Sequence, residues 1–144
     1  MTVGDDEVLA AFPDVPIDVD NVEHYRGLLS RSLLVNRCSG CGTWIYPHRP
    51  MCPRCWSWHV SATPVSGDGS LFMFTVIQQE RDPRAQGGEP TVAAAVELAE
   101  QVGLRYLSQI VNCPLDQLEL DMPVRLVWIE EHSRPAPAFE PVAR

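Results

Sequence analysis

The N-terminal part of the chain contains one segment with the hydrophobic periodicity of an α-helix. Its apolar residues on one face are Val22, Tyr25, Leu28 and Leu29. Asp20, followed three residues later by Glu23, is a variant of the capping box that begins a helix. We therefore expect a helix from about residue 21 to residue 30. Its apolar stripe packs either on its own domain or on a partner protein.

From residue 60 onward the pattern changes to short apolar runs separated by turns. The expected strands are Val60–Val65, Leu71–Gln78, Thr91–Leu98, Leu104–Val111 and Val124–Ile129. Gly67-Asp68-Gly69 forms a tight turn between the first two, and residues 81–90, with two prolines and two glycines, are an expected loop. Five short strands at this spacing predict a small closed barrel or a sandwich.

The two ends of the chain lack both periodicities. Residues 1–19 are acidic and carry two prolines, so we expect a tail or an extended arm. Ser133–Arg144 has three prolines and is expected to be an extended tail. The segment between the predicted helix and the strands is too short for a core of its own. We therefore divide the chain into an arm and helix (1–32), a cysteine-rich segment (33–59) and a barrel with its tail (60–144).

Composition excludes several kinds of chemistry. The chain has 144 residues and a formal net charge of -8, and its eleven basic residues are all arginines. Without lysine, it cannot form a lysine Schiff base or a P-loop lysine contact. The acidic balance argues against binding nucleic acid. The acidic start lacks the layout of a secretory signal, and no apolar run is long enough to cross a bilayer, so we expect a cytoplasmic protein with no membrane segment.

Two Cys-x-x-Cys pairs are the clearest candidate for chemistry. Cys38 and Cys41 form the first pair, Cys52 and Cys55 the second, and ten residues lie between them. Four thiolates at this spacing suit the tetrahedral ligation of a closed structural Zn²⁺ site. Gly42 after the first pair permits the tight turn that aims backbone N–H groups at sulfur. Iron in a rubredoxin-like site is the main alternative, because cytosolic thiols stay reduced and a thioredoxin-type pair needs a βαβ unit.

Other reactive residues give weaker signals. Cys113 stands alone before a proline, without a positive neighbour, and is expected to be an inert cysteine at a strand end. His48 and His59 flank the second cysteine pair and are expected at the surface or around the metal ligands rather than among them. No catalytic motif and no acid/base pair can be recognised.

Aromatic residues and arginines surround the cysteines and give a candidate contact surface. The candidate partner interface comprises Tyr25, Leu28, Leu29, Trp44, Tyr46, Trp56 and Trp58. Trp, Tyr and Arg are favoured at protein interfaces, although the same aromatic residues can instead cover a segment too small to bury itself. Arg49 and Arg54 are candidates for contacts with the phosphates of coenzyme A, with simple solvation as the alternative.

Later motifs follow the cysteine pairs in a specific order. They are Asn36-Arg37-Cys38-x-x-Cys41-Gly42, Pro47-His48-Arg49-Pro50-x-Cys52-Pro53-x-Cys55, Ser66-Gly67-Asp68-Gly69-Ser70, Phe74-Thr75-Val76, Val96-Glu97-Leu98, Arg105-x-x-Ser108, Asp121-Met122-Pro123-Val124, Pro135 and Phe139-x-Pro141. From residue 22 onward the chain resembles the OB-fold, acyl-CoA-associated family first catalogued as domain of unknown function 35. It departs from this family by an extra residue near Glu100–Gly103, which affects a local loop.

This resemblance implies a mainly β fold, in which an N-terminal helix and a rubredoxin-like zinc ribbon precede a five-stranded OB-fold barrel. It also implies a non-catalytic accessory subunit of a thiolase-fold acyl-CoA enzyme. The expected partner is a thiolase-like or lipid-transfer-protein-like subunit, in an aldolase acting on coenzyme A thioesters of steroid side chains. A subunit of an acetyl-CoA acetyltransferase or hydroxymethylglutaryl-CoA synthase-type complex is the alternative, and a single-strand nucleic-acid-binding module is a third reading.

Overall fold

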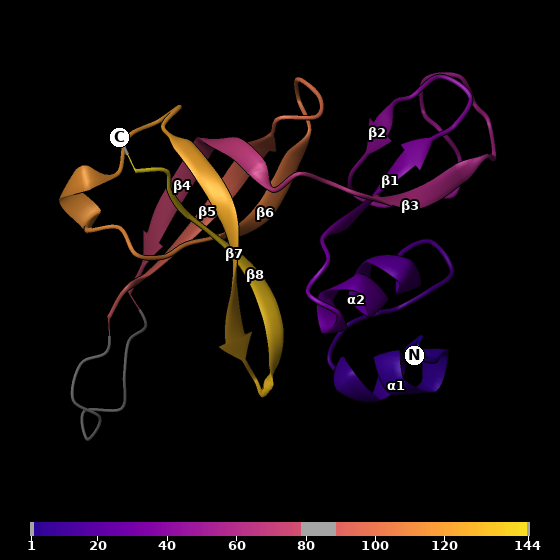
Figure 1. Cartoon of the computed structure of the whole chain (residues 1–144), viewed down its shortest axis with the longest axis horizontal. Coiled ribbons are helices and arrows are strands. Elements are labelled where there is room, and N and C mark those ends of the chain that lie inside the picture. Colours follow the sequence, from indigo (N-terminus) through magenta and orange to yellow (C-terminus); the bar gives the residue numbers. More distant parts are fainter. Residues whose placement is uncertain (1, 79–88, 144) are drawn as a thin grey trace.

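The structure is a computed structural model that describes residues 2–78 and 89–143. Two helices lead into a three-stranded sheet, and a closed five-stranded barrel follows (Figure 1). The predicted mainly β fold, with a helical start, a cysteine-bearing ribbon and a barrel, is therefore confirmed. Residues 81–88 of the expected loop lie outside the described residues. None of the helices in the described ranges has the length and apolar composition needed to span a bilayer.

The N-terminal arm contains a helix, α1 (Asp5–Ala11), so the expectation of a tail or an extended arm is wrong. Its first turn is acidic, and negative charge there is favourable beside the unpaired backbone N–H groups. Val8 and Phe12 are buried in the core. At the other end, Arg134 donates a hydrogen bond of 2.5 Å to the backbone oxygen of Ala11 and stacks on Phe12. Arg134 lies 123 positions further along the chain, so local patterning cannot reveal this support.

Helix α2 (Val22–Leu29) confirms the predicted helix but begins in a different way. Asn21 is the N-cap residue, and its side-chain oxygen accepts a hydrogen bond from the N–H of Asp18 at 2.9 Å. The predicted capping box at Asp20 is therefore wrong, because the preceding turn supplies the local hydrogen bonds. The apolar stripe packs on its own domain, with Leu28 in the core.

The cysteine-rich segment forms a small antiparallel sheet with the order β2-β1-β3. Its strands are β1 (Leu34–Cys38), β2 (Trp44–Ile45) and β3 (Val60–Pro64). All five residues of β3 pair with β1, so the expectation that this segment is the first barrel strand is wrong. Residues 60–64 continue directly from the second cysteine pair and return along β1. We therefore propose that the ribbon unit extends through Pro64.

The barrel has the strand order β4-β5-β6-β8-β7. Its elements are β4 (Asp68–Ile77), β5 (Thr91–Leu98), β6 (Arg105–Ile110), the 3₁₀ helix η1 (Leu115–Gln117), β7 (Pro123–Glu131) and β8 (Arg134–Pro141). The alanine-rich segment of β5 is a strand, as predicted. The barrel has five strands, as expected, but β8 is one of them and β3 is not.

Strand β8 lies in the segment expected to be an extended tail, and that expectation is wrong. It pairs with β7 along its whole length, and Phe139 bridges to Ile110 of β6. The N–H of Val142 bonds to the oxygen of Pro123, so the even-numbered residues of β8 face β7. Its three prolines stand at odd-numbered positions and therefore remove no hydrogen bond from this ladder.

The side chain of Gln101 bonds the barrel to the ribbon. Gln101, in the turn after β5, accepts a hydrogen bond from the backbone N–H of Trp44 at 2.9 Å. Its amide also donates to the backbone oxygen of the same residue at 3.1 Å. Gln101 thus satisfies both backbone groups of Trp44 in β2, as a paired strand would.

Candidate metal centre

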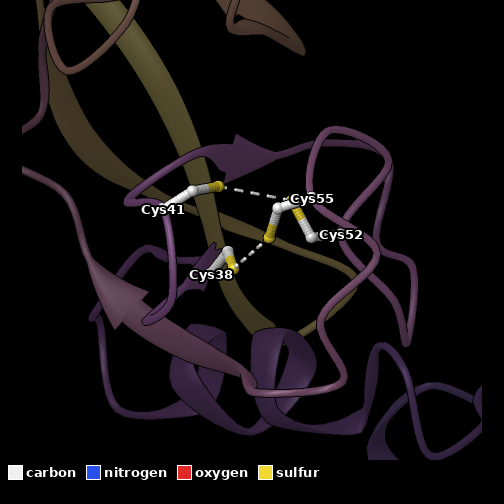
Figure 2. A group of neighbouring side chains, drawn as sticks. All are labelled: Cys38, Cys41, Cys52 and Cys55. Atoms are coloured by element: carbon white, nitrogen blue, oxygen red, sulfur yellow. Dashed lines mark hydrogen bonds between the residues drawn. The ribbon is translucent and has the colours of Figure 1, made fainter.

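Four cysteine sulfurs converge at one end of the ribbon (Figure 2). The sulfurs of Cys38, Cys41, Cys52 and Cys55 all lie within 4.8 Å of one another. The Sγ–Sγ distance is 3.5 Å between Cys38 and Cys55, and 3.6 Å between Cys41 and Cys52. A tetrahedral ion with Zn–S bonds of about 2.3 Å separates its sulfur ligands by about 3.8 Å. The spacing therefore fits one shared ion, and it is far too long for disulfides of about 2.05 Å.

The two cysteine turns have the same backbone conformation and the same hydrogen bond. After the first pair, Gly42 has φ of 79° and donates a hydrogen bond to the oxygen of Cys38 at 2.9 Å. After the second pair, Trp56 has φ of 63° and donates to the oxygen of Cys52 at 2.9 Å. The tight turn expected at Gly42 is confirmed. Trp56 adopts the left-handed region that a side chain other than glycine rarely occupies.

The electrostatics of the quartet favour a bound cation. The hydroxyl and backbone N–H of Thr43 lower the pKa of Cys41 to about 6. The backbone N–H of Cys41 likewise lowers the pKa of Cys38. The backbone N–H of Ser57 favours the thiolate of Cys55, but the neighbouring sulfurs outweigh it and raise its pKa to about 12. Negative charges on neighbouring sulfurs repel one another, so a cation that shares their charge would stabilise the thiolates.

Comparison with known proteins identifies the type of ribbon. Residues 26–57 match the family model described as "ChsH2, rubredoxin-like zinc ribbon domain". Residues 62–129 match the model described as "ChsH2, C-terminal OB-fold domain". A "DUF35 domain-containing scaffold protein" from Methanocaldococcus jannaschii is 32% identical over 110 residues, which cover 74% of this chain and 75% of that protein. The chain belongs to the DUF35 family.

Other relatives of the DUF35 chain agree with this assignment. A scaffold protein of the same description from Methanothermobacter thermautotrophicus is 32% identical over 76% of this chain and 81% of its own length. A "Probable enoyl-CoA hydratase alpha subunit" from Thermomonospora curvata is 32% identical over 90% of the DUF35 chain. The matched region is only 40% of that protein, so the DUF35 chain spans less than half of its length.

Two solved structures are similar to the DUF35 chain. A chain of the "Ltp2-ChsH2(DUF35) aldolase" has a TM-score of 0.77 and 31% identity, and the match covers 90% of this chain and 99% of that one. A DUF35-family protein of unknown function from Sulfolobus solfataricus has a TM-score of 0.62 at 14% identity, covering 94% and 95%. The second match shows the shared fold alone. Together with the four-cysteine geometry, the ribbon match supports structural zinc.

The histidine expected near the metal belongs instead to an aromatic cluster. His48 packs against His24 with tilted rings whose centroids are 4.6 Å apart, and the ring centroids of Tyr46 and Tyr106 are 5.0 Å apart. Nδ1 of His24 donates to the oxygen of Leu34 at 2.9 Å, which leaves Nε2 to accept from the Tyr106 hydroxyl at 3.3 Å. The cluster links α2, the ribbon and the barrel. The cluster could not be predicted from residue spacing, because its members are up to 82 positions apart in the sequence.

Burial of this cluster predicts a loss of stability in acid. Desolvation lowers the pKa of His24 from 6.5 to about 4, so the unfolded chain binds a proton that the folded chain rejects. The free energy of unfolding should therefore fall as the pH drops below 6.5, by about 3 kcal/mol on approaching pH 4. Urea unfolding of the zinc-loaded DUF35 chain at several pH values measures this slope.

The variant His24→Gln should flatten the pH dependence, because an amide can keep the bond to Leu34 without titrating. His59→Gln, on the exposed surface of the ribbon, is the matched control and should retain the slope. Zinc content is measured at each pH so that metal loss is scored separately. An unchanged slope in His24→Gln would assign the acid sensitivity to other groups.

The candidate interface residues separate into two groups. Leu28 and Trp44 are buried in the core, and Tyr25, Leu29 and Tyr46 are half-buried against it. Trp56 and Trp58 are 73% and 69% exposed. The buried and half-buried residues leave little surface for a partner. We therefore keep only the two exposed tryptophans as candidates for the partner interface.

The candidate phosphate contacts lie in different surroundings. Arg49 and Trp58 line a groove of about 650 Å³, together with Asp20 and Glu23. The two carboxylates make this groove less favourable for an anion. Arg54 is exposed at the second cysteine turn, where its backbone N–H donates to the sulfur of Cys52 at 3.4 Å. Of the two arginines, Arg54 is the better placed for an anion.

Cys113 lies just after β6, half-buried against the core. Burial raises the pKa of its thiol, which disfavours the reactive thiolate. The structure thus agrees with the expectation of an inert cysteine at a strand end.

Proposed function

We propose that this DUF35 chain is a non-catalytic accessory subunit of a thiolase-fold acyl-CoA enzyme. The observation that carries the proposal is its similarity to a chain of the Ltp2-ChsH2(DUF35) aldolase, at 31% identity over 99% of that chain. Four cysteines would fill the coordination of a structural zinc and leave no open position for substrate. The buried polar pair of His24 and Tyr106 is mutually satisfied, so its role is structural.

The finer proposal is an aldolase that cleaves coenzyme A thioesters of steroid side chains in the cytoplasm. The catalytic acid/base groups would lie on the thiolase-like partner. This chain would stabilise the partner and help to complete its acyl-CoA site. Its exposed Trp56 and Trp58 would contact protein, and Arg54 and Arg49 would contact phosphates of coenzyme A. A location where thiols stay reduced suits a zinc–thiolate ribbon.

A second candidate is a scaffold in an acetyl-CoA acetyltransferase or hydroxymethylglutaryl-CoA synthase-type complex. The observation that favours it is the description of both archaeal relatives as scaffold proteins. In this case the same chain would join two enzymes rather than complete one.

Co-expression with a thiolase-like protein from the same organism tests the proposal. The two proteins should co-purify in a fixed ratio. The complex should cleave a steroid side-chain coenzyme A thioester, and neither protein should do so alone. Condensation of acetyl-CoA by the complex would favour the second candidate. Turnover by this chain alone, or failure of the two proteins to associate, would contradict an accessory role.

A further inference from the structure

Half of strand β4 has an edge with no neighbouring strand in the described part of the chain. β4 pairs with β5 almost throughout, but its ladder with β7 covers only residues 68–70. Leu71 then bonds to the backbones of Met122 and Asp121 at 3.0 and 2.7 Å. Beyond it, the β4–β5 and β7–β8 hairpins separate (Figure 1). We call the remaining segment, Phe72–Ile77, the β4 edge.

The register shows which peptide groups point outward along the β4 edge. The N–H of Ala99 bonds to the oxygen of Asp68, so the odd-numbered residues of β5 face β4. Beyond the bulge after Leu71, Phe74 and Val76 pair with even-numbered residues of β5. Their N–H and C=O groups therefore point away from β5, toward the open edge. This is the hydrogen-bonding pattern that an added strand completes.

Four of the six side chains of the β4 edge are apolar and exposed, whereas Phe74 packs against the core and Thr75 is polar. The exposed fractions are 37% for Phe72, 58% for Met73, 37% for Val76 and 44% for Ile77. On the outer face, Met73 is in register with Ala95 and, across β5, with Leu107, which is 67% exposed. No charged residue or proline occurs from residue 69 to residue 78. Natural edge strands of this kind are protected or paired, because they otherwise promote aggregation.

We propose that the β4 edge binds an extended segment of the thiolase-like partner subunit by strand addition. This inference rests on the proposed function and names the surface through which it acts. Asp121, whose backbone N–H bonds to the oxygen of Leu71, is an exposed acidic residue at the start of the β4 edge. The matching partner segment has apolar residues at alternate positions along the strand and a basic residue where it meets Asp121.

Charge also distinguishes this partner from a second copy of the chain. Pairing the β4 edges of two copies would bring together two chains that each carry a net charge of -8. Like charges placed against each other weaken such a contact. A basic strand from another protein removes this repulsion and satisfies the same backbone groups.

Amide hydrogen exchange on the full, zinc-loaded chain tests the open edge directly. In the chain alone, the amides of Phe74 and Val76 should exchange much faster than those of Met73 and Thr75, which face β5. In the complex with the thiolase-like subunit, the same two amides should slow by about tenfold or more. Protection of both amides in the chain alone would show that the edge is already covered and would overturn the inference.

Surface variants test the contact in the same complex. Val76→Lys and Met73→Lys each place a positive charge on the β4 edge and should weaken partner binding by about tenfold or more. Val102→Lys is the matched control: it removes a 93% exposed valine from the β5–β6 turn and should change affinity less than about twofold. Circular dichroism and zinc content check that each variant is folded, and Met73→Lys serves if Val76→Lys is not.

The outcomes separate this inference from the proposed function. If the complex forms but exchange at the β4 edge and the affinity of both folded lysine variants are unchanged, the surface is wrong and the function stands. If the unmodified chain forms no complex, the proposed function fails, and the inference fails with it. A concentration-dependent dimer of the chain alone that Val76→Lys abolishes would assign the edge to a second copy and overturn the proposal.

Discussion

Replacing Cys52 with serine should unfold the ribbon and release the zinc. Cys52 and Cys38 are fully buried, and the other two cysteines complete a quartet whose sulfurs need a shared cation. Structural zinc in small domains contributes about 10–16 kcal/mol of apparent binding free energy, which matches or exceeds the total stability of an ordinary domain. Elemental analysis should fall from one zinc per chain to near zero, and the near-ultraviolet circular dichroism of the ribbon tryptophans should collapse.

The control for this change is Cys113→Ser, which alters a half-buried cysteine outside the quartet. It should retain one zinc per chain and the same dichroism spectrum. A strong chelator should reproduce the effect of Cys52→Ser on the unmodified chain, and added Zn²⁺ should reverse it. Freshly purified, reduced protein with an intact ribbon but no bound metal would contradict a structural role. Iron in place of zinc would keep the site and change the identity of the ion.

The ribbon could be predicted from the sequence because its determinants are local. Two residues separate the cysteines of each pair, and one glycine follows the first pair, so spacing alone indicates where the sulfurs meet. The matching turn at Trp56 escaped prediction. Its φ of 63° accompanies the hydrogen bond to the oxygen of Cys52, and a tryptophan gives no indication of such a turn.

Elements that depend on distant partners were misassigned. β3 has the same alternating pattern as a barrel strand, and only its register with β1 places it in the ribbon. α1 is too short to show a clear periodicity. The side chain that bonds to the oxygen of its last residue, Arg134, comes from β8. The sequence gives no indication that the side-chain amide of Gln101 bonds to the backbone of Trp44, because the two residues are far apart along the chain. These contacts join the three parts of the chain and arise from tertiary packing.

Phe139→Ala should lower the free energy of unfolding by about 3–5 kcal/mol, the usual cost of truncating a fully buried phenylalanine. Phe139 is 0% exposed and lies in β8, which joins β6 to β7 and so closes the barrel. Its ring centroid is 6.5 Å from that of Tyr106, so the cavity would also loosen the aromatic cluster that holds α2. Urea unfolding of the zinc-loaded chain measures the change.

Val142→Ala is the matched control for this experiment, because it truncates a 38% exposed side chain three residues further along. It should change the free energy of unfolding by less than about 0.5 kcal/mol. Equal, small effects of the two variants would mean that this segment is a dispensable tail, as its prolines first indicated. A large effect of Phe139→Ala alone would show that the proline-rich segment is part of the barrel, because a phenylalanine in an exposed tail would leave no cavity on truncation.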